Sequence, residues 1–145
     1  MQVSPSDTAK RQAMAAYVAM WRDVAVVSAT SDWRSARLGA HATGDALSVL
    51  SRQMYADRYN HLVSKGDPVN KPVVESVTPV GAPKTVMVHD CGDDSGWLKY
   101  RADNGQPVDD QPGGKRSITA EVKLVSDGSW RVTRFAVEGV GACTG

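Results

Sequence analysis

Apolar residues near the start of the chain recur at helical spacing. Ser4 is a suitable helix N-cap, Pro5 fits the first helical position, and Asp7 lies where a capping box places an acid. The pattern predicts an amphipathic helix that begins at Pro5 and ends at Thr30-Ser31-Asp32. Its apolar stripe is spaced by three and four residues and consists of Met14, Tyr17, Trp21, Val24 and Val27.

Two more helices are expected before the pattern changes. Ser35 to Ala42 is predicted to form a short helix, and Thr43 is predicted to cap the next one. Lys65-Gly66, followed by Asp67-Pro68, is expected to end that helix. Its inner face is assigned to Ala46, Leu47, Leu50, Met54, Tyr55 and Leu62.

The second half of the chain has the alternating pattern of strands. Between Lys115 and Val125, apolar and polar residues alternate, which predicts a strand with one buried and one solvent-exposed face. In the last strand the alternation slips between Val132 and Phe135, which predicts either a bulge or a strand buried on both faces. The predicted strands cover residues 73–77, 85–90, 96–101, 115–125 and 130–140.

Helices followed by an antiparallel meander indicate the α+β class. We expect one domain over residues 1–145, with helices within about residues 5–65 and strands within about residues 72–141. The helices should pack on a curved, mainly antiparallel sheet that forms a cone-shaped roll.

Composition and charge argue against two classes of protein. The chain is 41% hydrophobic and 23% charged, as in ordinary globular domains. Its net charge is +1, from 17 basic and 16 acidic residues, so no overall field attracts nucleic acid or an anionic membrane. No apolar stretch approaches the roughly 18 residues that a membrane span needs. Nucleic-acid binding and a membrane-spanning segment are therefore not expected.

The two cysteines, Cys91 and Cys143, each follow a strand-like segment. An even pair placed to tie the chain terminus onto the sheet predicts a disulfide and an oxidising compartment. The bond should hold the final strand beside the third-from-last and stabilise the fold by about 4 kcal/mol on the chain-entropy model. The alternative is two unrelated buried thiols in a cytosolic protein. The acids Asp90, Asp93 and Asp94 around Cys91 disfavour a reactive thiolate.

The N-terminal residues Met1-Gln-Val-Ser-Pro-Ser lack the basic and apolar regions of a signal peptide. An oxidising compartment therefore implies that a targeting segment preceded the sequence and that Met1 was added for expression. Whether Met1 is native stays open.

Metal-binding patterns are weak throughout the sequence. The acidic residues Asp90, Asp93, Asp94, Asp103, Asp109 and Asp110 do not have the alternate spacing and distant Glu of a calcium loop. Histidines occur singly, at His41, His61 and His89, whereas zinc requires three or four converging ligands. We assign no metal site, no cofactor and no catalytic residue from the sequence.

Five segments carry recognisable motifs, at residues 42–47, 90–100, 112–116, 127–133 and 140–143. Together they resemble a family of small actinobacterial secreted proteins, many of them lipoproteins of unknown function. The resemblance implies an extracytoplasmic protein, anchored to lipid through a cysteine upstream of residue 1. The pattern is also similar to the nuclear transport factor two superfamily, whose fold is called cystatin-like or ketosteroid-isomerase-like.

The superfamily resemblance implies a pocket inside the cone. Isomerases and dehydratases of this type use a carboxylate or histidine as general base and a tyrosine as proton donor. Candidate pairs here combine Asp45 or His41 with Tyr17 or Tyr55. The aromatic residues expected to line the pocket are Tyr17, Trp21, Tyr55, Tyr59 and Trp97.

Three functional hypotheses follow, and the sequence leaves enzymatic activity uncertain. The favoured one is a non-catalytic extracytoplasmic binding module, tethered to the envelope, whose partner is a protein or a small apolar ligand. The alternatives are a small-molecule enzyme of the ketosteroid-isomerase or dehydratase type and an envelope lipoprotein of a phage or mobile element. A homodimer through the sheet face is also open. An enzyme should hold a desolvated carboxylate or histidine beside a tyrosine in a concave pocket, whereas a binding module should have a plugged or shallow cone and an exposed apolar patch.

Overall fold

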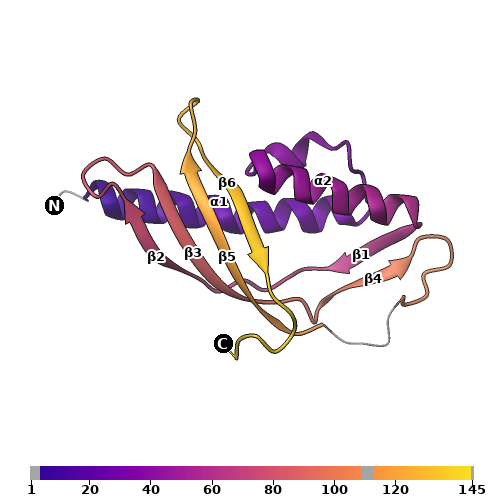
Figure 1. Cartoon of the computed structure of the whole chain (residues 1–145). Coiled ribbons are helices and arrows are strands. Elements are labelled where there is room, and N and C mark those ends of the chain that lie inside the picture. Colours follow the sequence, from indigo (N-terminus) through magenta and orange to yellow (C-terminus); the bar gives the residue numbers. More distant parts are fainter. Residues whose placement is uncertain (1–3, 109–112, 145) are drawn as a thin grey trace.

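The computed structural model describes residues 4–108 and 113–144 (Figure 1). Within these ranges the helical part consists of helix α1 (Pro5–Ser28), a short 3-10 helix, η1 (Ala36–Gly39), and helix α2 (Gly44–Tyr59). The strands are β1 (Leu62–Gly66), β2 (Pro72–Thr78), β3 (Thr85–Asp93), β4 (Trp97–Arg101), β5 (Lys115–Leu124) and β6 (Trp130–Val137).

The strands form two antiparallel sheets. The larger has the order β2-β3-β5-β6, and the smaller pairs β1 with β4. Figure 1 shows α1 running across the four-stranded sheet, α2 beside β6, and the β1–β4 pair extending from one end. The chain is therefore an α+β roll, as the order of its elements predicts.

Helix α1 begins and packs as its sequence predicts. The Ser4 side chain accepts a 3.0 Å hydrogen bond from the Asp7 backbone N–H, which caps the first turn. The apolar stripe faces the sheet, and Tyr17 within it is completely buried. The helix ends at Ser28, two residues before the predicted stop.

The predicted C-terminal part of α2 is wrong. The helix ends at Tyr59, and His61 takes a left-handed φ of 58° that turns the chain into β1. Leu62, assigned to the helix from its spacing, instead pairs with Arg101 of β4. Gly66 does not stop a helix but ends β1 with a φ of 97°, directly opposite Trp97. A Cβ at Gly66 would lie 1.8 Å from the Gly96 carbonyl oxygen, so the β1–β4 pairing requires glycine there.

The connection between the two helices is less helical than expected. Only the 3-10 turn Ala36–Gly39 forms within the predicted helix from Ser35 to Ala42. Thr43 occupies the N-cap of α2, but its side chain makes no capping hydrogen bond. Its backbone N–H donates instead to the Val132 carbonyl, at 2.9 Å, and so fixes this segment to β6.

The phase slip in the last strand is a β-bulge. Glu121 of β5 pairs with Arg134 and Val122 pairs with Val132, which leaves Thr133 as the extra residue. The Thr133 hydroxyl donates to the Glu121 side chain at 2.8 Å. The bulge lets Phe135, beyond it, pack against the core.

The predicted disulfide is confirmed. Cys91 of β3 is bonded to Cys143 in the tail that follows β6, with a Cα–Cα distance of 5.9 Å. The bond does not hold the final strand beside residues 97–101, as predicted, because those residues belong to the other sheet and β6 pairs with β5. The bond therefore ties the tail across β5 to β3. In the described part of the chain, no helix combines the length and apolarity that crossing a bilayer requires.

Candidate functional site

One buried hydrogen bond joins α1 to the inner face of the sheet. The Tyr17 hydroxyl donates to Oδ2 of Asp90, at 2.7 Å, and both residues are 0% exposed. Two further donors reach the same carboxylate: the Asn70 side-chain amide at 2.7 Å and the Lys71 backbone N–H at 2.6 Å. Asp90 is thus a buried acid held by three hydrogen bonds, none of them from a cationic side chain.

Sequence reasoning placed Asp90 at the end of the predicted strand 85–90 and treated it as an acidic neighbour of Cys91, although strand alternation indicated that it points into the core. Val86, Val88 and Asp90 occupy every second position of β3, and all three are completely buried. Because alternate residues of a strand share a face, Asp90 had to point into the core with the two valines. Partners from α1 and from the chain before β2 then satisfy its carboxylate.

Burial raises the pKa of the Tyr17 phenol far above its ordinary value of 10.0, and the neighbouring Asp90 carboxylate raises it further. The phenol therefore stays protonated at physiological pH and acts as a donor. A phenol of this kind cannot ionise beside an existing carboxylate without a large electrostatic cost.

A cavity of about 400 Å³ lies close to this pair. Asn70 and Gly92, the immediate neighbours of Asp90, are among the residues that line it. Asp90 and Tyr17 are not among them. The acid–tyrosine pair therefore lies beneath the cavity wall. The apolar part of the lining consists of Trp21, Pro68, Trp97, Ile118 and Val137.

Of the five aromatic residues expected in the pocket, Trp21 and Trp97 line this cavity. Their rings meet edge to face, with centroids 6.3 Å apart. Tyr17 fills the core of the cone below them. The other two point outward from α2: Tyr55 is 52% exposed and packs edge-on against Trp33, and Tyr59 is 74% exposed.

Two ion pairs border the cavity. Arg116 Nε donates to Asp94 Oδ2 at 2.8 Å, and Lys99 Nζ donates to Asp57 Oδ1 at 2.8 Å. Asp57, on the inner side of α2, also accepts a hydrogen bond from Gln53. Apart from Asp94, which was considered as a calcium ligand and rejected, sequence reasoning did not select these residues. Asp57 lies three residues after the buried Met54 on α2, so helical spacing places both on the same face. That spacing was the signal in the sequence that Asp57 points inward.

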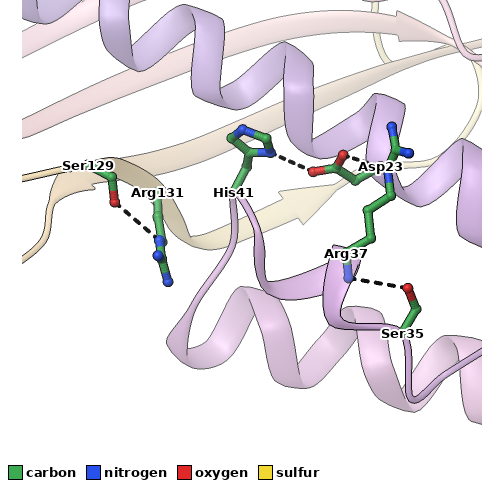
Figure 2. Close-up of polar contacts among 6 residues, drawn as sticks. All are labelled: Asp23, Ser35, Arg37, His41, Ser129 and Arg131. Atoms are coloured by element: carbon green, nitrogen blue, oxygen red, sulfur yellow. Dashed lines mark hydrogen bonds and ion pairs between the residues drawn. The ribbon is translucent and has the colours of Figure 1, made fainter. Parts of the chain in front are cut away.

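The sequence-derived acid–base pairs do not form. Asp45 is exposed in the first turn of α2, and Tyr55 faces solvent. His41 pairs instead with the buried Asp23 of α1, its Nδ1 lying 2.6 Å from Oδ2 (Figure 2). Arg37 Nε donates to the other oxygen of Asp23, at 2.9 Å.

The Asp23–His41 arrangement has the form of the positioning half of a catalytic triad, which would need a serine beside the imidazole. In Figure 2, Ser35 and Ser129 both lie apart from the imidazole and have other partners. The Ser35 hydroxyl accepts from the Arg37 backbone N–H, and the Ser129 hydroxyl donates to Asp127. The cluster therefore fastens the α1–α2 connection to α1 and presents no activated nucleophile.

Converging metal ligands do not occur in the part of the chain that the structure describes: no three His, Cys, Asp or Glu side chains meet there. His89 instead contacts the Ser117 hydroxyl at 2.8 Å, and His61 is an exposed turn residue. Asp103 is exposed in the loop after β4, and Asp109 and Asp110 lie outside the described residues.

Comparison with known proteins assigns the fold alone. No family model matches the chain, and no curated protein matches its sequence. Among solved structures, the chain resembles the intermembrane space region of chloroplast protein ARC6, with a TM-score of 0.60, 17% identity, and coverage of 96% of this chain and 99% of that one.

Two further structures share the fold. A ketosteroid isomerase-like protein from Erwinia carotovora atroseptica matches with a TM-score of 0.58 and 12% identity, over 91% of this chain and 96% of that one. A protein of unknown function with a cystatin-like fold from Nostoc punctiforme matches with a TM-score of 0.51 and 9% identity, over 98% and 97%. The chain therefore has the cystatin-like, nuclear-transport-factor-two-like roll.

Proposed function

We propose that this protein is a non-catalytic extracytoplasmic binding module whose ligand site is the cavity lined by Trp21 and Trp97. The observation that carries the proposal is the position of the Tyr17–Asp90 pair. It is the acid–tyrosine combination that an isomerase-like mechanism needs, yet both residues are 0% exposed and neither lines the cavity. A general base must come within hydrogen-bond reach of its substrate, and Asp90 is enclosed by three protein donors.

The cone is not plugged, contrary to the expectation for a binding module, but the lining of its cavity favours binding over proton transfer. The cavity volume of about 400 Å³ lies in the range of small-molecule sites, and the lining combines apolar walls with a few polar groups. Asp93, an acid on the lining, has its pKa lowered by hydrogen bonds from Ser95, which makes it a weak base. Asp94, another acid there, is engaged by Arg116.

The disulfide supports an extracytoplasmic location, because such bonds persist in oxidising compartments. We also propose that the protein belongs with the small actinobacterial secreted proteins and lipoproteins that its motifs at residues 90–100 and 127–133 resemble. Cell fractionation tests the location: the native protein should occur in the envelope or the medium, and an exclusively cytoplasmic protein with reduced cysteines would contradict it.

Turnover of a β,γ-unsaturated 3-ketosteroid tests the absence of isomerase chemistry. Conversion to the conjugated enone is followed by ultraviolet absorbance, with buffer and the Tyr17→Phe variant measured in parallel. We expect the wild-type rate to equal the buffer rate. A rate above buffer that disappears in Tyr17→Phe would show that the pair is catalytic and would overturn the proposal.

A further inference from the structure

Four residues separate the ligand cavity from a second one. A neighbouring cavity of about 440 Å³ shares Asp94, Trp97, Lys99 and Arg116 with the first. Both cations therefore lie at the boundary, within reach of a molecule in either cavity. The first cavity offers the Trp21 and Ile118 side chains beside this boundary, so apolar and cationic surfaces are adjacent.

Arg116 presents an unused edge at this boundary. In the described part of the chain it donates through Nε alone, to Asp94, and its two terminal nitrogens have no protein acceptor. The Asp94 carboxylate also accepts the Gly114 backbone N–H at 2.8 Å, so it is held in place while it orients the guanidinium. A guanidinium held by Nε leaves its Nη groups free for bidentate contact with a carboxylate.

Lys99 adds a second cation with spare donors. Its Nζ makes one hydrogen bond, to the buried Asp57, and the side chain is 41% exposed. An ammonium group has three donors, so two remain for a ligand. Asp57 neutralises part of the Lys99 charge, as Asp94 does for Arg116. Asp93 adds a further negative charge on the cavity lining, and its carboxylate accepts a hydrogen bond from the Ser95 N–H at 2.9 Å.

Trp21 contributes its ring to the cavity wall. Its side chain is 8% exposed, and its indole Nε1 is completely buried. This N–H interacts with the Tyr17 hydroxyl in the core, so Trp21 offers a ligand an apolar ring and no donor.

These features favour one ligand class, and the inference rests on the proposed function. We propose that the cavity binds a small amphipathic carboxylate, with its apolar body against Trp21 and Trp97 and its carboxylate on Arg116 and Lys99. Each of the three acids at the boundary, Asp57, Asp93 and Asp94, already accepts hydrogen bonds from protein donors, whereas Arg116 and Lys99 keep spare donors. A carboxylate can use these donors, and a neutral ligand would leave most of them unused.

Three eight-carbon probes of matched shape test this class: octanoate, octanol and octylammonium. The chain has four tryptophans. Each gives one indole N–H signal in a nitrogen–proton correlation spectrum, in a region apart from the backbone amide signals. Trp33 and Trp130 do not line the two cavities and serve as internal references. We expect octanoate to shift the Trp21 and Trp97 signals, to leave the references unchanged, and to bind about tenfold tighter than octanol.

Matched variants identify the group that carries the preference. Arg116→Gln should remove the tenfold advantage of octanoate, whereas Arg134→Gln, on the outer face of β6, should preserve it. Because Arg116→Gln also leaves Asp94 unpaired, the double variant Asp94→Asn with Arg116→Gln is included and should lose the advantage too. Asp94→Asn alone should strengthen octanoate binding. The dispersion of each variant's backbone spectrum shows whether it is folded.

The outcomes separate this inference from the proposed function. Octanol or octylammonium binding as tightly as octanoate, with Trp21 and Trp97 shifted, would leave the binding module standing and overturn the carboxylate assignment. An unchanged octanoate preference in the folded double variant would do the same. If none of the three probes shifts either indole, the cavity is not a small-ligand site, and both proposals fail.

Discussion

The Tyr17 hydroxyl and the Asp90 carboxylate, 73 residues apart in sequence, form a 2.7 Å hydrogen bond in the core of the roll. This bond joins α1 to β3 and places a polar contact where apolar packing would otherwise be continuous. In this account it is structural, and its effect should therefore appear in stability.

Removing the phenol should destabilise the fold. Tyr17→Phe deletes one of three donors to a buried carboxylate and should lower the free energy of unfolding by about 1.5–3 kcal/mol. Urea unfolding monitored by circular dichroism measures the change. Tyr59→Phe, at a side chain 74% exposed, is the matched control and should change stability little. Equal stability of Tyr17→Phe and the wild type would show that the bond contributes nothing.

The raised pKa of Tyr17 predicts loss of stability in alkaline solution. The native phenol keeps its proton above the ordinary pKa of 10.0, whereas the phenol of the unfolded chain loses it. The native state then binds more protons than the unfolded state, so unfolding becomes easier as pH rises above 10. Each further pH unit should cost the wild type about 1.4 kcal/mol relative to Tyr17→Phe. Urea titrations at several values above pH 10 measure this; parallel pH dependences of the two proteins would contradict it.

Two glycines with positive φ angles should respond differently to alanine. At Gly66 a Cβ would collide with the Gly96 carbonyl, whereas at Gly128, with φ 87°, nothing lies within 4 Å. Gly128→Ala should therefore cost only the left-handed strain, about 1 kcal/mol. Gly66→Ala should cost at least twice as much, because β1 and β4 must also separate. Thermal unfolding compares them, and equal losses would show that the β1–β4 contact is not tight.

The disulfide should provide much of the stability of the tail and sheet. Cys91 and Cys143 are 52 residues apart, and closing a loop of that size stabilises the folded state by about 4 kcal/mol on the chain-entropy model. Cys91→Ser with Cys143→Ser should lose an amount of this order in urea unfolding. Mass spectrometry of the wild type should show a gain of two hydrogens on reduction. No gain in mass would refute the bond itself.

Local patterns in the sequence were sufficient to predict most elements. Residues close together in the sequence were enough to predict the apolar stripe on α1, the cap at Ser4 and the bulge at Thr133. Strand β1 could not be found in this way, because Leu62 has the spacing of an α2 residue. Its partner, β4, is distant in sequence, and that pairing, together with the left-handed turn at His61, decides its structure.

The site depends still more on long-range contacts. Strand alternation shows that Asp90 points inward, but only the folded chain brings Tyr17 and Asn70 to it. The same holds for the boundary cations, since Lys99 meets Asp57 across 42 residues. The apolar stripe of α1 correctly predicted that Trp21 points inward. Tyr55 and Tyr59 instead lie on the solvent side of α2, because the spacing of residues in that helix did not show which side faces the sheet.

The cavity lined by Trp21 and Trp97 is the proposed binding site. An isotope-filtered nuclear Overhauser spectrum of the labelled protein with unlabelled octanoate tests it most directly, because each signal locates the ligand at a named side chain. Octanoate bound in the cavity should give signals from its methylenes to Trp97 and Ile118, both on the cavity lining. Signals confined to Trp33, Trp130 or the outer face of the sheet would contradict it.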